Sequence, residues 1–179
     1  MTEATGYTAT ETLHTTGHNG VTYAYRRLGS AGPRPTVLLQ HFRGNLDNWD
    51  PALIDALAID RDVITFDNVG VAGTAGTTPT SITEMAHDAI AFMDSLDLGT
   101  VDLSGFSIGS FIAQEIAAIR PAMLGKIVRA PAAPQGAPRM HGWAEDIIET
   151  AGKPQVDAAG MLHSFFRDTS TSREAGVAF

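Results

Sequence analysis

The sequence predicts an α/β fold built on a doubly wound, mostly parallel sheet. Two observations lead to this prediction. Short, unbroken apolar runs recur as far as Ala130, and each ends at a polar or glycine-rich turn. Between them lie segments in which apolar residues keep the helical period of about 3.6 residues. Such an alternation is typical of parallel strands that helices cover on both faces of the sheet.

The chain is expected to open with an antiparallel hairpin. Residues 12–16 and 21–28 are predicted strands, and His18-Asn19-Gly20 lies between them. Asn-Gly supplies the positive φ angles of a tight hairpin turn. The preceding residues, 1–11, are interpreted as a polar tail.

Strands and helices then alternate. Four further apolar runs are predicted strands, at residues 36–40, 62–66, 101–104 and 126–130. Helices are predicted at residues 51–59, 82–96 and 108–119. Pro51 suits the first turn of the first helix, and Ser81 with Glu84 has the spacing of a capping box before the second.

Residues 132–179 no longer follow this alternation. A stretch rich in Pro, Gly and Ala precedes predicted helices at residues 143–150 and 156–166 and a last one from Ser172. We therefore divide the chain into an α/β core, residues 1–131, and a separate helical part, residues 132–179.

Composition and charge exclude several classes of partner. The net charge is −8 and no run of Lys or Arg occurs, which argues against binding to nucleic acid or to an anionic membrane surface. The chain has no cysteine, so disulfides and thiolate metal sites are excluded. Neither a targeting segment nor an apolar run of about 20 residues is present. We expect a soluble, cytoplasmic protein without metal or cofactor, whose partner is a small molecule.

The segment Gly105–Gly109 is the strongest candidate for a catalytic motif. It reads Gly105-Phe106-Ser107-Ile108-Gly109 and stands between a predicted strand and a predicted helix. A nucleophilic serine on such a sharp turn needs small neighbours, because its own backbone is strained and adjacent Cβ atoms would collide. The alternative, a phosphate-binding loop, fits less well, because the glycine spacing differs and no lysine is near. Ser107 is therefore the predicted nucleophile.

Acyl transfer also needs two donors for the oxyanion of the tetrahedral intermediate. The N–H of Ile108, directly after the nucleophile, is the first. The second is expected in the loop after residues 36–40, from the N–H of Arg43 or, alternatively, of Phe42. His41 in this loop is interpreted as a buried, hydrogen-bonded residue rather than a catalytic one.

These motifs resemble the α/β-hydrolase superfamily from about Gly20 to Pro131. His41-Phe42-Arg43-Gly44 is similar to the His-Gly oxyanion loop of that superfamily, with Phe42 in place of glycine. The loop Asp67–Gly73 resembles its Asp-x-Arg-Gly-x-Gly loop, with Val69 where arginine is common. The resemblance is nearest to the cofactor-free haloperoxidase and esterase branch. It implies that residues 132–179 are the start of a helical cap.

The resemblance also implies a catalytic acid and a histidine on loops after later strands. No buried strand is predicted after residues 126–130, and none of residues 131–135 is acidic. The remaining candidates lie in the helical part: His141, His163, Asp146, Asp157 and Asp168. We regard a catalytic pair among them as the weaker interpretation. We expect the sequence to stop inside its cap, before the C-terminal core strands, the acid and the histidine.

Three functions are therefore considered. The first is a serine hydrolase that acts on a small ester or related acyl substrate, with its Asp and His partners outside this chain. The second is a non-catalytic binding or interaction module on the same scaffold. The third is a perhydrolase that makes peracids with the same serine. The edge strand at residues 126–130 is expected to be exposed, and to favour self-association or pairing with a companion fragment.

Overall fold

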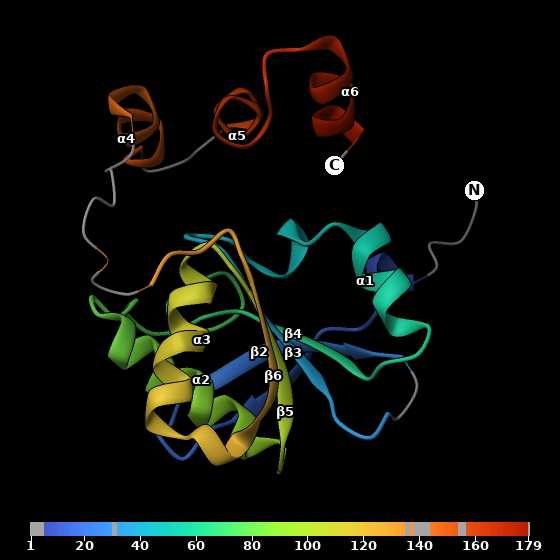
Figure 1. Ribbon diagram of the computed structural model, residues 1–179, viewed down its shortest axis with the longest axis vertical. Helices are drawn as coiled ribbons and strands as arrows, with labels where there is room; N and C mark the ends of the chain where they lie inside the picture. The colour runs from blue at the N-terminus through green and yellow to red at the C-terminus, as the bar shows by residue number, and fades with distance from the viewer. Residues whose placement is uncertain (1–5, 30–31, 135–136, 138–143, 154–156, 179) are drawn as a thin grey trace. The chain divides into compact units, whose positions relative to one another are not determined.

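The computed structural model describes residues 6–29, 32–134, 137, 144–153 and 157–178. The chain divides into two compact units, Met1–Gly136 and Ala137–Phe179. We call them the first unit and the second unit (Figure 1).

A six-stranded sheet forms the centre of the first unit. Its strands are β1 (Leu13–Thr16), β2 (Thr22–Leu28), β3 (Thr36–Leu39), β4 (Val63–Phe66), β5 (Val101–Phe106) and β6 (Leu124–Ala130). Their order across the sheet is β1-β2-β4-β3-β5-β6. Strands β4, β3, β5 and β6 are parallel, and β1 and β2 are antiparallel to their neighbours. The predicted mostly parallel sheet is confirmed.

Helices connect the parallel strands. They are α1 (Pro51–Ala58), α2 (Ile82–Ser95) and α3 (Ile108–Ile119), with 3₁₀ turns at Gly6–Ala9, Leu46–Asn48 and Pro121–Met123. Ser81 caps α2, because its hydroxyl accepts a hydrogen bond from the Glu84 N–H at 3.2 Å. The same hydroxyl donates to the Glu84 carboxylate at 2.8 Å, so the predicted capping pair forms through the hydroxyl.

The sheet lies between two helical layers, with α2 and α3 on one face and α1 on the other (Figure 1). Strand β3 packs on both faces of the sheet, because its residues alternate between two buried clusters. Val37 and Leu39 belong to the larger cluster with Phe92 of α2 and Ile112 of α3. Leu38 belongs to the smaller cluster on the α1 side. Burial on both faces explains the unbroken apolar run of this strand.

Two expectations for the start of the chain are wrong. Residues 1–11 are not simply a polar tail, because Gly6–Ala9 form a 3₁₀ turn in which Tyr7 is only 1% exposed. In the hairpin loop, Gly20 has a positive φ of 79°, whereas Asn19 does not. The loop is closed instead by the N–H of Gly17, which donates to the Val21 carbonyl at 2.9 Å.

The second unit consists of three short helices, α4 (Glu145–Ala151), α5 (Ala158–Phe165) and α6 (Ser170–Ala178). They occur close to the predicted positions, although α5 has no buried residue. That this unit is the start of a cap stays a prediction. Within the described part of the chain, no helix is both long enough and apolar enough to span a membrane.

Strand β6 forms one edge of the sheet over the described residues. It pairs with β5 on one side, and most of its residues are exposed. Ile127 and Val128 are its exposed large apolar side chains, at 38% and 60%. The expected exposed apolar edge is therefore present.

Candidate active site

Ser107 is the single residue between the end of β5 and the start of α3. Its φ is 55° and its ψ is −118°, a backbone conformation that non-glycine residues rarely adopt. Hydrogen bonds hold this residue on both sides. Its N–H donates to the Ala130 carbonyl of β6 at 2.9 Å, and its carbonyl accepts from the Ser110 N–H at 2.9 Å. The strain predicted from the motif is present.

Glycine is required at both ends of this turn, which we call the elbow (Gly105–Gly109). A Cβ at Gly109 would fall on the carbonyl of Leu39 in β3. A Cβ at Gly105 would meet the carbonyl of Gly109. The first turn of α3 thus lies directly against the end of the sheet, as the glycine spacing predicted. The buried hydroxyl of Ser110 ties the two parts together by donating to the Gly105 carbonyl at 2.6 Å.

The start of α3 is suited to hold negative charge. Ile108 is the first helical residue, so its N–H has no partner within the helix. The side chain of Ser107 makes no capping hydrogen bond there. The helix dipole also favours negative charge at this end. An oxyanion beside Ser107 would therefore meet a backbone donor and a favourable field.

A second loop lies next to the elbow because β3 and β5 are neighbours. Leu39 of β3 is opposite Gly105 of β5 in the sheet. His41 comes two residues after Leu39, and Ser107 comes two residues after Gly105. The rings of His41 and Phe106 confirm the contact, with centroids 5.6 Å apart and planes at 85°. The structure thus brings the loop of the predicted second donor beside the predicted nucleophile.

This loop is a tight turn, which we call the oxyanion turn (His41–Gly44). The N–H of Gly44 donates to the His41 carbonyl at 3.0 Å. Arg43 has a φ of 63°, as the third residue of a type II turn does. Phe42 and Arg43, the two predicted donors, are therefore its central residues, and both side chains are exposed.

His41 is a buried residue within this turn. Its N–H donates to Oε1 of Gln40 at 2.8 Å, and its ring Nδ1 lies 2.9 Å from the Phe42 carbonyl oxygen. Burial lowers the pKa of the imidazole below its ordinary value, so the ring is neutral at pH 7. These contacts agree with its interpretation as a hydrogen-bonded loop residue.

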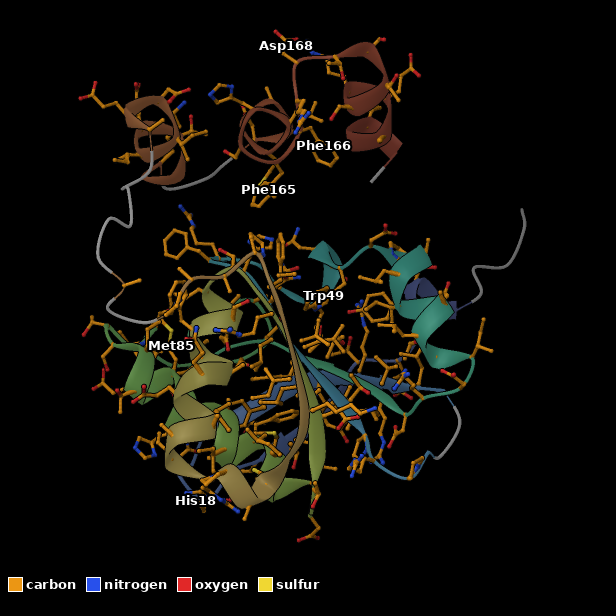
Figure 2. The ribbon with its side chains drawn as sticks, in the orientation of Figure 1. His18, Trp49, Met85, Phe165, Phe166 and Asp168 are labelled. Atoms are coloured by element: carbon orange, nitrogen blue, oxygen red, sulfur yellow. The ribbon has the colours of Figure 1, made fainter. Side chains whose placement is uncertain are left out.

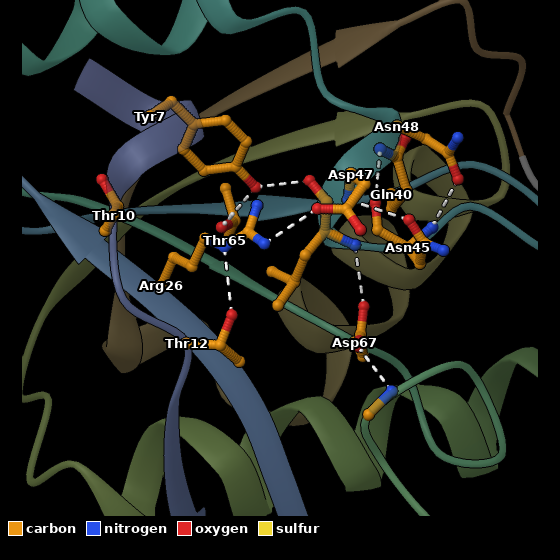
Figure 3. Close-up of polar contacts among 12 residues, drawn as sticks. Tyr7, Thr10, Thr12, Arg26, Gln40, Asn45, Asp47, Asn48, Thr65 and Asp67 are labelled. Atoms are coloured by element: carbon orange, nitrogen blue, oxygen red, sulfur yellow. Dashed lines mark hydrogen bonds and ion pairs between the residues drawn. The ribbon is translucent and has the colours of Figure 1, made fainter. Parts of the chain in front are cut away.

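Asp67, the first residue of the loop Asp67–Gly73, and Tyr7, from the expected polar tail, hold the chain just after this turn (Figure 3). The sequence did not indicate this role for either residue. The buried carboxylate of Asp67 accepts from the N–H of Leu46 at 2.8 Å and from the N–H of Gly73 at 2.9 Å. Burial raises the pKa of Asp67, although both amides act against this shift. The hydroxyl of Tyr7 donates to the Leu46 carbonyl at 2.6 Å. One sequence signal for Tyr7 exists, since it is the sole aromatic residue among residues 1–12.

The acid and histidine candidates lie in the second unit. Asp146 and His163 form a side-chain hydrogen bond at 2.8 Å, with side chains 60% and 52% exposed. The hydrogen bond from His163 lowers the pKa of Asp146. Asp157 instead caps α5, and Asp168 pairs with Arg173. His141 lies outside the described residues.

The second unit also contains a hollow. It is lined by Ala159, Leu162, His163, Phe166, Arg167, Asp168 and Arg173. Phe166 and Asp168, labelled in Figure 2, both follow the end of α5 at Phe165. No group of three or more His, Asp or Glu side chains that could hold a metal occurs among the residues described.

Comparisons with known proteins identify relatives that match most of the chain. The model of a family described as alpha/beta hydrolase fold matches residues 35–170, well over half of the chain. Among solved structures, an alpha/beta hydrolase fold protein from Chitinophaga pinensis matches with a TM-score of 0.87 and 37% identity. That match covers 97% of this chain and 62% of the other. A hydrolase from Pseudomonas aeruginosa, at 21% identity and a TM-score of 0.66, shares the fold.

Curated relatives cover a shorter stretch. Over 95 residues, 52% of this chain, it is 32% identical to a protein of Rhizobium rhizogenes that carries the name carbamate hydrolase RutD. Over 95 residues it is also 32% identical to a protein of Mycobacterium tuberculosis that carries the name non-heme bromoperoxidase BpoC. Each match covers 36% of the relative.

Proposed function

The chain belongs to the alpha/beta hydrolase fold family, and on this premise we propose that it is a serine hydrolase acting on a small ester or related acyl substrate. The observation that carries the proposal is the elbow. Ser107 has a strained backbone at the end of a central strand, and the first turn of α3, which has no side-chain cap, lies directly after it. Strain of this kind is retained where function requires it.

In the proposed reaction, Oγ of Ser107 attacks the acyl carbonyl carbon. The N–H groups of Ile108 and Arg43, or Phe42 in place of Arg43, stabilise the oxyanion that forms. The acyl–oxygen bond then breaks, and the alcohol leaves with the proton that Ser107 has lost. Water attacks the acyl-serine in the second half of the reaction, which releases the carboxylic acid and restores the hydroxyl.

Ser107 also needs a base, because a serine hydroxyl at its ordinary pKa is a weak nucleophile. We propose that the histidine and the carboxylate that activate it come from outside residues 1–179. The C. pinensis structure supports this, because the chain covers 62% of it and the rest of that protein offers further residues. The Asp146–His163 pair is exposed and belongs to the second unit.

One relative suggests a further class of acyl substrate. A carbamate, named for the R. rhizogenes relative, contains the same type of acyl carbonyl as an ester. Both would form a tetrahedral oxyanion at the same donors. We therefore include small carbamates among the proposed substrates.

A fluorophosphonate probe tests the proposal, because it reacts with activated serines. The full-length protein should be labelled on the peptide that contains Ser107, and Ser107→Ala should remove the label. Ser81→Ala, which changes the exposed cap of α2, is the control and should be labelled as the wild type is. A folded wild type that takes no label at Ser107 would contradict the proposal and favour the non-catalytic binding module.

Perhydrolysis is the second candidate, and the M. tuberculosis relative that carries a bromoperoxidase name favours it. Hydrogen peroxide would take the place of water in the second half-reaction and release a peracid, which oxidises bromide in solution. Bromination of monochlorodimedone should then require acetate, peroxide and Ser107 together. If bromination does not occur while Ser107-dependent ester hydrolysis does, the reaction is hydrolysis.

A further inference from the structure

Leu46 is held by hydrogen bonds on both of its peptide groups, with Asp67 and Tyr7, the partners that Figure 3 labels. Its N–H donates to the carboxylate of Asp67 at 2.8 Å. Its carbonyl accepts from the hydroxyl of Tyr7 at 2.6 Å. The Tyr7 oxygen is also 3.1 Å from the hydroxyl of Thr65 in β4. All of these groups are buried, so each hydrogen bond would leave an unpaired polar group if it were lost.

Tyr7 is itself fixed from three directions, although it comes from the very start of the chain. Its N–H donates to the carboxylate of Asp55 in α1 at 2.7 Å. The guanidinium of Arg26 lies 5.1 Å from the centre of its ring. Its side chain is buried in the cluster on the α1 side of the sheet. Tyr7 is therefore a fixed point, and Leu46 is attached to it.

The residues around Leu46 are tied down as well. Arg26 pairs with the carboxylate of Asp47 at 2.8 Å. Asn45 accepts from the N–H of Asp47 at 2.8 Å and donates its own N–H to Asn48 at 3.0 Å. The amide of Gln40 reaches across to the Asn45 carbonyl at 3.4 Å. The segment directly after the oxyanion turn is thus held on several sides, and only Gly44 lies between it and Arg43.

We propose that Tyr7 and Asp67 are positioning residues that set the oxyanion turn by holding the two peptide groups of Leu46. This inference rests on the proposed function, in which the Arg43 or Phe42 N–H binds the oxyanion. A misplacement of about 1 Å in such a donor can cost on the order of 100-fold in rate. Because the donor acts mainly on the transition state, its displacement lowers kcat and leaves KM largely unchanged.

The chain offers a matched pair of variants for the test. Tyr7→Phe removes the hydroxyl that binds Leu46 and keeps the ring that contacts Arg26. Tyr23→Phe is the control, because the Tyr23 hydroxyl also donates to a backbone carbonyl, that of Asp88 at 3.0 Å. The ring of Tyr23 is as buried as that of Tyr7, but Tyr23 joins the hairpin to α2 and not to Leu46. Both variants should lose similar stability.

Two measurements on the full-length protein separate positioning from stability. For Ser107-dependent hydrolysis of p-nitrophenyl acetate, Tyr7→Phe should lower kcat about tenfold with KM within about twofold, and Tyr23→Phe should lower neither. Hydrogen exchange should show faster exchange of amides 43–47 in Tyr7→Phe than in Tyr23→Phe. Asp67→Asn, which replaces one of the two acceptor oxygens, should show the same signature as Tyr7→Phe.

Each contrary result has a distinct meaning. Equal kcat values for Tyr7→Phe and Tyr23→Phe would overturn the positioning role, even if exchange at residues 43–47 is faster. Equal exchange in both variants would overturn the claim that Tyr7 holds this segment. If the wild type shows no hydrolysis that depends on Ser107, the proposed function fails, and hydrogen exchange then decides alone whether Tyr7 holds the turn.

Discussion

At the scale of single residues, the elbow combines strain with close packing. A residue with a Cβ that is held in a sparsely populated backbone region costs about 1–3 kcal/mol, and Ser107, with φ 55° and ψ −118°, carries that cost at the end of a central strand. Arg43 carries a similar cost in the oxyanion turn. Hydrogen bonds to β6 and to the first turn of α3 hold Ser107, and the hydrogen bond from the Gly44 N–H to the His41 carbonyl closes the turn that contains Arg43. The two strained positions therefore face the same end of the sheet, where the proposed chemistry occurs.

Replacement of a glycine in the elbow tests how close this packing is. Gly109→Ala should lower the free energy of unfolding by about 2–3 kcal/mol, because the new Cβ meets the backbone carbonyl of Leu39. Gly99→Ala is the control, since a Cβ there meets nothing, and it should raise stability by about 0.4–1 kcal/mol. Urea unfolding measures both. Similar effects of the two substitutions would show that the elbow is looser than described.

Because His41 is buried, we expect the free energy of unfolding to depend on pH. Its pKa in the folded chain is lowered by burial, so the folded state binds the proton less tightly than the unfolded state. The stability that it contributes is fully present above the unfolded pKa of about 6.5 and is lost as pH falls through the folded pKa. As pH falls below about 6.5, the free energy of unfolding of the wild type should therefore decrease more than that of His41→Gln. The free energy of unfolding of both proteins would be measured from pH 7.5 to pH 5. A difference between them that stays constant over this range would contradict the prediction.

At the scale of elements, local patterns were sufficient for most of the first unit. Strands β3 and β4 are unbroken apolar runs, and α3 occurs at the residues expected from its period. The end of β5 was predicted two residues too early, because Gly105 is strand through its pairing with β3 and β6, and Phe106 through its pairing with β6. The turn at Gly6–Ala9 was missed for a similar reason. Tyr7 is buried by partners about 40 to 60 positions away, which local sequence does not show.

The exposed edge strand gives a prediction about association. Val128 is 60% exposed on β6, and an apolar edge is a template for pairing with another strand. We expect the isolated chain to self-associate at concentrations on the order of tens of micromolar, and Val128→Lys to reduce this association. Ile59→Lys is the control, because Ile59 is 80% exposed after α1 and away from the sheet edge. A wild type that is strictly monomeric in light scattering would contradict the prediction.

At the scale of the whole molecule, the two units differ in what the sequence revealed. Both buried clusters and the elbow belong to the first unit, so the family could be predicted from residues 20–131. The site was predicted in part. Spacing indicated Ser107 and its glycines, whereas the role of Leu46 and its partners depends on contacts that form only in the fold. The helices of the second unit bury little, and their sequence did not indicate a substrate.

The central claim is that Ser107 is the nucleophile of an acyl-transfer enzyme, and trapping the acyl-enzyme tests it most directly. The full-length protein would be mixed with p-nitrophenyl acetate, quenched with acid within the first turnover and digested for mass spectrometry. We expect an acetyl group on the peptide that contains Ser107, formed together with a burst of p-nitrophenol and absent in Ser107→Ala. Hydrolysis that proceeds without acetylation of Ser107, or that persists at the wild-type rate in Ser107→Ala, would contradict the claim.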